Sequence, residues 1–207
     1  AILAGGLGTR LRSVVADQPK VLAPVGGKPF LTRLLDQLQG AGVTSAVLCT
    51  GHLGDQVEAA FGGAYHGMRL THSRESEPLG TGGALRAALP ALGSDPVLVL
   101  NGDSYCQTDL DGFWLAHAAS GADASIVVTR MPDVSRFGSV AMDPDLRVRR
   151  FDEKAAVSGE GWINAGIYLV GRRLLEGIPT GRAVSLEHEM FPRWLDARLC
   201  ADFSECP

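Results

Sequence analysis

The residues best suited to chemistry lie near the start of the sequence, where a glycine-rich segment is combined with cations. Residues 5–10 read GGLGTR and follow the apolar run Ala1–Ala4, which has the composition of a strand. Glycines let a backbone approach a ligand closely, and the N–H groups of such a turn can point at phosphate oxygens. Arg10 and Lys20 add two cations, which suit a polyphosphate better than a single phosphate. The segment predicts a polyphosphate site, although a glycine-rich turn without a ligand fits the loop alone equally well.

Two common nucleotide-binding glycine motifs do not fit this loop. The GK[ST] ending of a Walker A loop is absent, and Arg10-Leu11 follows where a dinucleotide fingerprint has its third small residue. A dinucleotide-binding oxidoreductase is therefore the weakest interpretation that remains.

Short apolar runs alternate with helical patterns through the first half of the sequence. We expect strands at residues 1–4, 45–50, 68–73, 96–100 and, further on, 124–130. Between them, apolar residues recur at the spacing of one helix face, starting from Leu31, Leu53 and Leu85. Strands that alternate with helices indicate right-handed βαβ units and hence a parallel sheet.

The second half reads as a β-rich region. Residues 138–142 and 147–152 flank a turn signal and predict a hairpin, residues 162–170 predict a longer strand, and Ser185 is placed to cap a helix over 185–195. The predicted class is α/β, with a Rossmann-like, mixed and mostly parallel sheet flanked by helices and a small β-rich acceptor region.

Composition excludes several classes of protein. The 207 residues are 45% hydrophobic, which suits one globular domain, and the net charge of −4 comes without a block of lysine or arginine, so no nucleic-acid partner is expected. No apolar run reaches the length of a membrane span, so no membrane partner is expected either. The four cysteines form no CxxC pair, which favours reduced thiols and a cytoplasmic protein. Both ends look truncated, since the sequence starts inside a strand and stops without a closing helix.

Ligands of a parallel sheet bind beyond the carboxyl ends of its strands, so the polar residues that follow each apolar run are the ones to examine. The glycine loop follows the first strand, Glu75–Gly83 follows the third, and Asn101–Asp103 follows the fourth. The carboxylate of Asp103 suits a hard cation such as Mg²⁺, which bridges phosphate oxygens. Taken alone, Asp103 suits a helix cap as well.

Together these segments resemble the sugar-1-phosphate nucleotidyltransferases, in the order of that family and over nearly the whole chain. The matching segments are Ala4–Leu11 (AGGLGTRL), Pro19-Lys20, Lys28-Pro29, Glu77–Ala84 (EPLGTGGA), Asn101–Asp103 (NGD), Phe151–Lys154 (FDEK) and Asn164–Tyr168 (NAGIY). The resemblance implies the nucleotide-diphospho-sugar transferase type of fold. It also implies a single domain over residues 1–207, with a nucleotide-binding half at 1–123 and a sugar-phosphate-binding half at 124–207.

The resemblance implies a role for each matching residue. Arg10, Lys20 and Asp103 are the expected catalytic residues, with the two cations on the triphosphate and Asp103 on Mg²⁺. The residues expected to bind the nucleotide are Leu3, Ala4, Gly5, Gly6, Gly8, Thr9, Glu75, Gly80, Thr81, Gly82, Asn101 and Gly102. The residues expected to bind the sugar phosphate are Gly138, Glu153, Lys154, Asn164 and Gly166.

Three of these roles carry a physical reason. The glycines of Leu79–Ala84 would admit the flat base closely, and backbone groups of Gly138 and Gly166 would reach sugar hydroxyls. The carboxylate of Glu75 would accept from the paired N–H donors of guanine, although the single N–H of uracil also fits.

The implied reaction is attack by an oxygen of a sugar 1-phosphate on the α-phosphorus of a nucleoside triphosphate, which releases pyrophosphate. The segments 11–17, 28–31 and 161–164 resemble most the D-glycero-α-D-manno-heptose-1-phosphate guanylyltransferases, which make GDP-heptose for bacterial polysaccharides, so GTP is favoured. Mannose-1-phosphate guanylyltransferases and N-acetylmuramate-1-phosphate uridylyltransferases stay open, as does a homo-oligomer.

One feature of the family has no match in this sequence. A second Mg²⁺-binding aspartate, in a late Asp-x-Gly-Thr-like segment, does not occur before Pro207. Either the sequence stops short of that segment or the metal site is incomplete. A non-catalytic regulatory subunit that binds nucleotide sugars therefore stays open, although the presence of Arg10, Lys20, Asp103 and Lys154 favours the enzyme.

Overall fold

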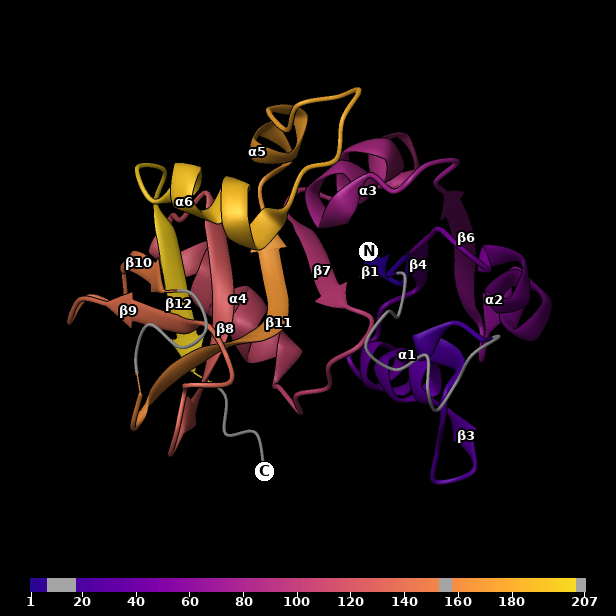
Figure 1. Cartoon of the computed structure of the whole chain (residues 1–207), viewed down its shortest axis with the longest axis horizontal. Helices are drawn as coiled ribbons and strands as arrows, with labels where there is room; N and C mark the ends of the chain where they lie inside the picture. Colours follow the sequence, from indigo (N-terminus) through magenta and orange to yellow (C-terminus); the bar gives the residue numbers. More distant parts are fainter. Residues whose placement is uncertain (7–17, 153–157, 204–207) are drawn as a thin grey trace. The chain divides into compact units, whose positions relative to one another are not determined.

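The structure is a computed structural model of the chain and describes residues 1–6, 18–152 and 158–203. The chain divides into two compact units that are interleaved in the sequence (Figure 1). The first unit holds residues 1–93, 100–105 and 175–184, and the second holds 94–99, 106–174 and 185–207. The division of function between residues 1–123 and 124–207 stays a prediction.

The first unit is built on a mostly parallel sheet in the order β7-β1-β4-β6-β5. Its strands are β1 (Ile2–Leu3), β4 (Ser45–Thr50), β5 (Ala64–Tyr65), β6 (Met68–Arg74) and the end of β7 (Val97–Asn101). β1 is parallel to both β4 and β7, β4 is parallel to β6, and β5 runs antiparallel to β6. The predicted strands of the first half and the predicted mixed, mostly parallel sheet are confirmed.

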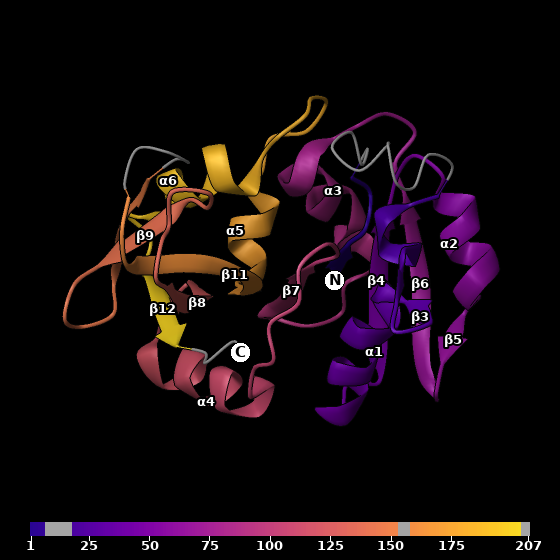
Figure 2. The same ribbon diagram turned by 60° about the horizontal axis from the view of Figure 1, so that its bottom comes forward.

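Helices and short turns connect these strands. They are η1 (Lys20–Leu22), α1 (Phe30–Gly40), α2 (Gly54–Phe61), α3 (Gly80–Ala88) and η2 (Leu89–Ala91), together with a small ribbon of β2 (Pro24–Val25) and β3 (Lys28–Pro29). The chain passes from β1 to β4 to β6 in one direction and then returns to β7 on the other side of β1. Because such crossovers are right-handed, the reversal places α3 on the face opposite α1. Figures 1 and 2 show α1 and α3 on either side of β1 and β4.

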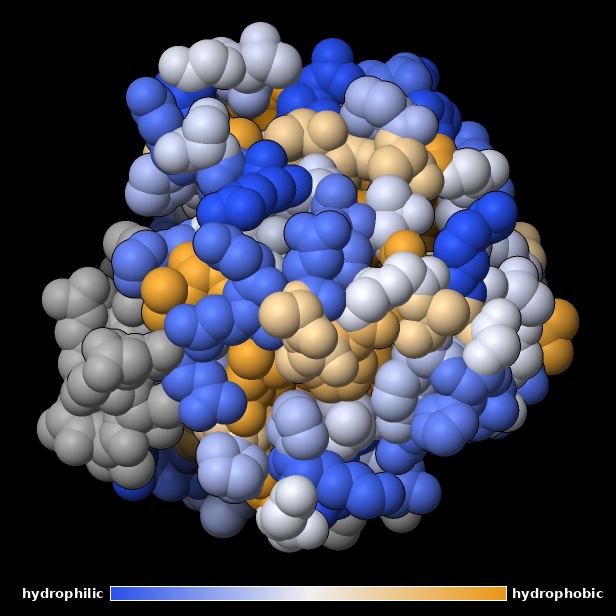
Figure 3. Space-filling view, turned by 90° about the vertical axis from the view of Figure 1, so that its right-hand side faces the viewer, coloured by the Kyte–Doolittle hydropathy of each residue, from blue (hydrophilic) through white to orange (hydrophobic). Residues whose placement is uncertain are grey.

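The periodic leucines of α1 form part of the core of this unit. Leu31, Leu34, Leu35 and Leu38 are almost fully buried, and burial of each leucine contributes roughly 1.5–3 kcal/mol. On the outer surface, the face in Figure 3 mixes hydrophilic residues with smaller hydrophobic groups. The helical face predicted from leucine spacing is thus the buried one.

The second unit is β-rich and centres on β8 (Ala124–Met131). β11 (Gly161–Val170) pairs antiparallel with β8, and β12 (Leu199–Phe203) pairs parallel with it. β9 (Ser139–Met142) and β10 (Val148–Asp152) form the predicted hairpin, and β9 also pairs with β11. The remaining helical segments of the chain are α4 (Leu110–Ser120), α5 (Arg172–Glu176), η3 (Leu186–Met190) and α6 (Phe191–Trp194).

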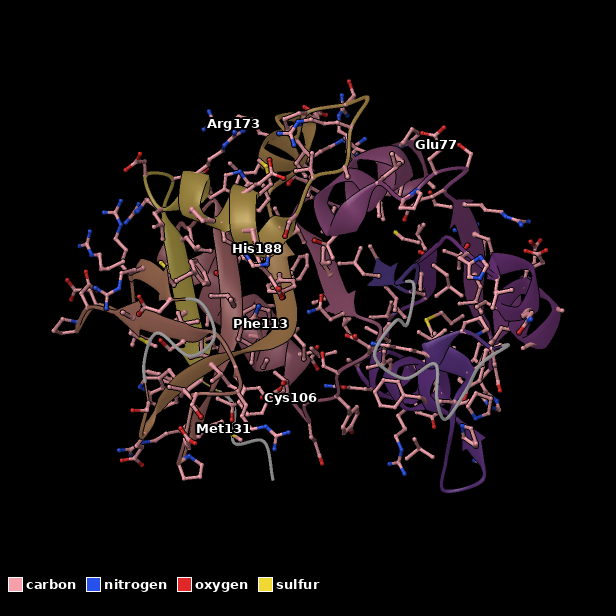
Figure 4. All side chains as sticks on the ribbon, viewed as in Figure 1. Glu77, Cys106, Phe113, Met131, Arg173 and His188 are labelled. Atoms are coloured by element: carbon pink, nitrogen blue, oxygen red, sulfur yellow. The ribbon has the colours of Figure 1, made fainter. Side chains whose placement is uncertain are left out.

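Aromatic side chains fill much of the core of the second unit. The ring of Phe191 stacks on Phe151 with centroids 5.4 Å apart and meets Tyr168 at 4.9 Å. Phe113 is buried on α4, which packs against β8 and β12 (Figure 4). Ser185 accepts a hydrogen bond from the N–H of His188 at 3.1 Å, so the predicted helix cap is confirmed.

The cysteines differ from the prediction at one position. Cys49 and Cys200 are free thiols, whereas Cys106 is disulfide-bonded. The prediction of reduced cysteines is therefore wrong for Cys106, because pairing depends on which distant residues the fold brings together and not on sequence spacing. Within the described ranges, no helix is long and apolar enough to cross a membrane.

Candidate functional site

The carboxyl ends of β1 and β7 lie side by side in the first unit. Leu3 is paired with Asn101 in the parallel register, and its carbonyl oxygen accepts from the N–H of Gly102 at 2.9 Å. Beyond this point the chain leaves β1 as the glycine loop and leaves β7 toward Asp103. The order of connections reverses between these two strands, and ligands of open α/β sheets bind at such a switch point. Leu3, Asn101 and Gly102, which we predicted to bind the nucleotide, therefore lie side by side at this switch point.

The glycines here are required for two different reasons. A Cβ on Gly102 would lie 2.5 Å from the carbonyl oxygen of Leu3, and a Cβ on Gly5 would lie 3.2 Å from the backbone nitrogen of Gly51. Both glycines allow neighbouring backbones to approach. Gly6 differs, since its Cβ would meet nothing within 4 Å among the described residues. Space beside Gly6 is what a ligand-binding turn needs.

Lys20 and Asp103 form an ion pair at this edge, with Nζ of Lys20 3.5 Å from Oδ2 of Asp103. Lys20 opens η1, where the neighbouring Val21 and Leu22 are buried and anchor the turn. The side chain of Lys20 is 27% exposed and that of Asp103 is 59% exposed. The pair therefore presents a cation and an accessible carboxylate together at the end of the sheet.

Glu75 follows β6 and is half-buried between two parts of the candidate site. Its Oε2 accepts from the N–H of Leu79 at 2.7 Å, and its Oε1 lies 3.0 Å from the position of a Cβ on Gly5. Burial raises the pKa of Glu75, and the bond from Leu79 opposes that rise. Glu75 thus links the start of the glycine loop to the residue before α3.

The glycines at the start of α3 are packed against another segment of the same unit. The carbonyl oxygen of Val184 accepts from the N–H of Gly82 at 2.8 Å, and Val184 donates to the carbonyl of Leu79 at 2.8 Å. Gly80 has a φ of +69°, and its Cβ would lie 2.6 Å from the oxygen of Val184. These glycines therefore allow the close approach of Val184, and the close approach of a base that we inferred for them stays a prediction. The nucleotide-binding roles of Gly80, Thr81 and Gly82 stay predictions.

Asn164 lies in β11 of the second unit and is bonded within the protein. Its Oδ1 accepts from the N–H of Gly166 at 2.7 Å, and its Nδ2 lies 2.8 Å from the hydroxyl of Tyr168 and 3.4 Å from Oε1 of Glu187. The N–H of Gly166 is thus bonded to Asn164, and the contact of its backbone with a sugar hydroxyl stays a prediction. Gly138 allows the hairpin to close, since its Cβ would lie 3.0 Å from the carbonyl oxygen of Asp152.

Five predicted site residues lie outside the described part of the chain: Gly8, Thr9, Arg10, Glu153 and Lys154. Among the residues that are described, no group of three His, Cys, Asp or Glu side chains could hold a metal ion. The role of Asp103 in binding Mg²⁺ stays a prediction.

Two residues that shape these sites were not predicted. Val184 contacts the start of α3 across about a hundred positions of sequence, and Glu187 contacts Asn164. Val184 stands in no glycine-rich or charged motif, and Glu187 and Glu189 indicate the start of a helix in the sequence and not a site. Their contacts follow from the tertiary structure.

The class of protein follows from the fold, the switch-point residues and a family comparison. The model of the nucleotidyl transferase family matches residues 1–196. The chain belongs to this family, so the predicted identification as a nucleotidyltransferase and an enzyme is confirmed.

The relatives include proteins with two substrate assignments. The chain is 37% identical over 192 residues to D-glycero-alpha-D-manno-heptose 1-phosphate guanylyltransferase of Aneurinibacillus thermoaerophilus. This match covers 93% of this chain and 83% of that protein. It is 38% identical over 195 residues to mannose-1-phosphate guanylyltransferase of Mycobacterium tuberculosis, with 94% of this chain matched. The match spans about half of that longer relative, 54%.

The fold is also that of a solved relative. The crystal structure of HddC from Yersinia pseudotuberculosis, complexed with GMP-PN, superposes with a TM-score of 0.88 at 33% sequence identity. The match covers 100% of this chain and 90% of HddC. The predicted α/β architecture is therefore confirmed by a solved structure that is similar over the whole length of this chain.

Proposed function

We propose that this protein transfers a guanylyl group from GTP to D-glycero-α-D-manno-heptose 1-phosphate, giving GDP-heptose and pyrophosphate. The observation that carries the proposal is the Lys20–Asp103 pair, which stands where the two central strands end and the order of connections reverses. A cation beside an accessible carboxylate is what a site for a metal-bound triphosphate needs.

The choice of substrates is supported by the relatives. The heptose guanylyltransferase of A. thermoaerophilus is matched over most of its length, whereas the mannose guanylyltransferase of M. tuberculosis is matched over about half. HddC was crystallised with GMP-PN, which favours a guanine nucleotide over a uracil nucleotide. Half-buried Glu75 supports the same preference, because a carboxylate can accept from both N–H donors on the edge of guanine.

Asp103 suits Mg²⁺ as the cofactor. Mg²⁺ retains several waters and is commonly held by one or two carboxylates plus the phosphates of a substrate, and Asp103 provides one such carboxylate with more than half of its side chain exposed. When bound, Mg²⁺ would neutralise charge on the phosphates. The ammonium of Lys20 would then contact phosphate oxygens beside it.

The chemistry asked of the protein is positioning and charge neutralisation. The attacking oxygen of a sugar 1-phosphate is already an anion, so no general base is required. We assign Lys20 and Arg10 to the triphosphate and Lys154 to the acceptor phosphate, and pyrophosphate leaves in line with the attack. The backbone of Gly6 faces open space among the described residues and is available to approach phosphate oxygens.

The test is a matrix of pyrophosphate release with Mg²⁺. Each of the four nucleoside triphosphates is combined with heptose, mannose, glucose and N-acetylmuramate 1-phosphates. We expect release with GTP and the heptose phosphate above all other pairs. Release with GTP and mannose 1-phosphate alone would move the assignment to mannose, and release only with UTP would overturn the guanylyl assignment.

A regulatory subunit that binds nucleotide sugars without turnover is the second candidate, because the described residues hold no group of three His, Cys, Asp or Glu side chains that could bind a metal ion. Binding of GDP-heptose without pyrophosphate release by any pair would favour it. A role in bacterial polysaccharide synthesis in the cytoplasm belongs to the proposal for the enzyme, and a homo-oligomer is compatible with either candidate.

A further inference from the structure

Asn164 has its hydrogen-bonding groups engaged inside the second unit. An amide side chain has one accepting oxygen and one NH₂ group with two donors. The oxygen of Asn164 accepts from Gly166, and its nitrogen is within reach of both Tyr168 and Glu187. Asn164 was expected to bind the sugar phosphate, yet these contacts leave neither N–H of its amide for a ligand.

A distortion of β11 creates this arrangement. The register of β11 against β8 shifts between Asn164 and Tyr168, and Gly166 lies in the left-handed region with a φ of +81°. In a regular strand, residues four apart are separated by about 13 Å along the strand. The register shift and Gly166 lie between the two residues, and the amide of Asn164 reaches the hydroxyl of Tyr168.

The contact from Asn164 ends on Glu187, whose backbone lies in a helical segment with a hydrogen-bonded start. Ser185 accepts from the N–H of His188 at 3.1 Å and donates its own N–H to Oε1 of Glu189 at 3.1 Å. These reciprocal bonds define the start of η3, two residues before Glu187. Glu187 is exposed, and its neighbour His188 lies beside β11 in Figure 4.

We propose that Glu187 binds hydroxyl groups of the sugar and that Asn164 acts as its positioning residue. The inference rests on the proposed function, since it assumes a sugar 1-phosphate as the acceptor. A carboxylate accepts about four hydrogen bonds, and the contact with Asn164 uses one of them. Two neighbouring hydroxyls of a sugar can donate to the two oxygens of one carboxylate.

The negative charge of Glu187 determines whether it contacts the phosphate or the hydroxyl groups of the ligand. A carboxylate repels a phosphate and attracts hydroxyl donors. Glu187 therefore faces the neutral ring or side chain of the sugar, and it distinguishes sugars by the position of their hydroxyls. This makes Glu187 a specificity residue and not a catalytic residue.

The test measures binding without turnover. Isothermal titration calorimetry with heptose and mannose 1-phosphates, in the absence of nucleotide, is carried out on the wild type, Glu187→Ala and Glu187→Gln. Glu160→Gln is the matched control, because Glu160 is an exposed carboxylate of the same unit, paired with Arg130. We expect Glu187→Ala to weaken binding about tenfold, as for a lost hydrogen bond to a charged group, with Glu187→Gln in between and the control unchanged.

Monodeoxy derivatives of mannose 1-phosphate separate direct contact from a structural role. Loss of the hydroxyl that Glu187 binds should weaken binding to the wild type about tenfold and leave binding to Glu187→Ala unaffected. Asn164→Ala should reduce the difference in affinity between mannose 1-phosphate and that deoxy derivative. Equal effects of every deoxy derivative on the wild type and on Glu187→Ala would overturn the proposal.

The two proposals can fail separately. If the deoxy experiment gives the expected pattern but no triphosphate yields pyrophosphate, Glu187 stands as a sugar-binding residue and the proposed transfer is wrong. If pyrophosphate is released normally and Glu187→Ala binds sugar phosphates as the wild type does, the assignment of Glu187 is wrong. A wild type that binds none of the sugar phosphates overturns both.

Discussion

The ammonium of Lys20 lies 3.5 Å from the carboxylate of Asp103, although the two residues come from distant parts of the sequence. The parallel pairing of β1 with β7 holds the end of β7 beside the start of the glycine loop. Asp103 is mostly exposed, and exposed ion pairs contribute little to stability. If the pair binds the triphosphate as proposed, its removal should affect activity more than folding.

Lys20→Ala should lower kcat for pyrophosphate release by about 100- to 1000-fold, because removal of one group that stabilises developing charge typically costs that much. Asp103→Ala should weaken the dependence on Mg²⁺ as well. Steady-state kinetics across a Mg²⁺ titration measures both effects. The control is Asp55→Ala, which removes an exposed carboxylate paired with Arg74 in the same unit. Equal losses in Asp55→Ala and Asp103→Ala would contradict the assignment.

Gly80→Ala should destabilise the protein strongly, because the new methyl group would lie 2.6 Å from the carbonyl oxygen of Val184 at a residue with a φ of +69°. The left-handed backbone alone costs a side chain about 1–2 kcal/mol. Gly42→Ala is the matched control, since Gly42 has a φ of +72° at the end of α1 and nothing within 4 Å of its Cβ among the described residues. In urea unfolding, Gly80→Ala should lose clearly more free energy of unfolding than Gly42→Ala. Similar losses would show that the segment around Val184 is not held against α3.

Glu75→Gln and Glu75→Ala should separate two roles of this side chain. Glutamine can still accept from the N–H of Leu79, whereas alanine leaves that donor unpaired at a cost of about 1 kcal/mol. Because burial raises the pKa of Glu75 in the folded protein, the wild type should gain stability relative to Glu75→Gln as pH falls through that raised pKa toward the ordinary value. Urea unfolding at several pH values measures this. A raised KM for GTP in Glu75→Gln, without loss of stability at neutral pH, would support contact with the base.

His117 should make the stability of the protein sensitive to mild acid. Its Nδ1 lies 2.8 Å from the hydroxyl of Ser125, and burial lowers its pKa, against the opposing charges of Asp123 and Asp95. The folded protein therefore binds this proton more weakly than the unfolded chain. The contribution of His117 is complete above the ordinary histidine pKa and declines as pH falls through it toward the lower value of the folded state.

The slope from this one group cannot exceed about 1.4 kcal/mol per pH unit. Urea unfolding between pH 7.5 and 5.5 should show a smaller decline for His117→Asn than for the wild type. His52→Asn, at an exposed histidine, serves as the control and should follow the wild type. A wild-type curve parallel to that of His117→Asn would overturn the prediction.

Patterns that are local in sequence were predicted well. Leucine spacing identified the buried face of α1, apolar runs identified β4, β6 and β8, and Ser185 identified the start of η3. Helix α4 was not predicted, because Phe113, Trp114 and Leu115 stand in a row and carry no helical period. β12 was not predicted either, since it is short and lies close to the end of the sequence. Its partner β8 lies about 75 residues earlier.

The sequence by itself determined the class of protein. The glycine loop, Lys20, Asp103 and the later motifs are short segments, and both their composition and their order along the chain can be read without a structure. Only the tertiary structure decided what several of those residues touch. It pairs Lys20 with Asp103, packs Val184 against the glycines at the start of α3, and brings Asn164 within hydrogen-bond distance of Glu187. The physical reason is the same in each case. A glycine or an amide in a motif is compatible with a ligand or with another part of the chain, and the choice depends on backbone approach and hydrogen bonds between residues far apart in sequence.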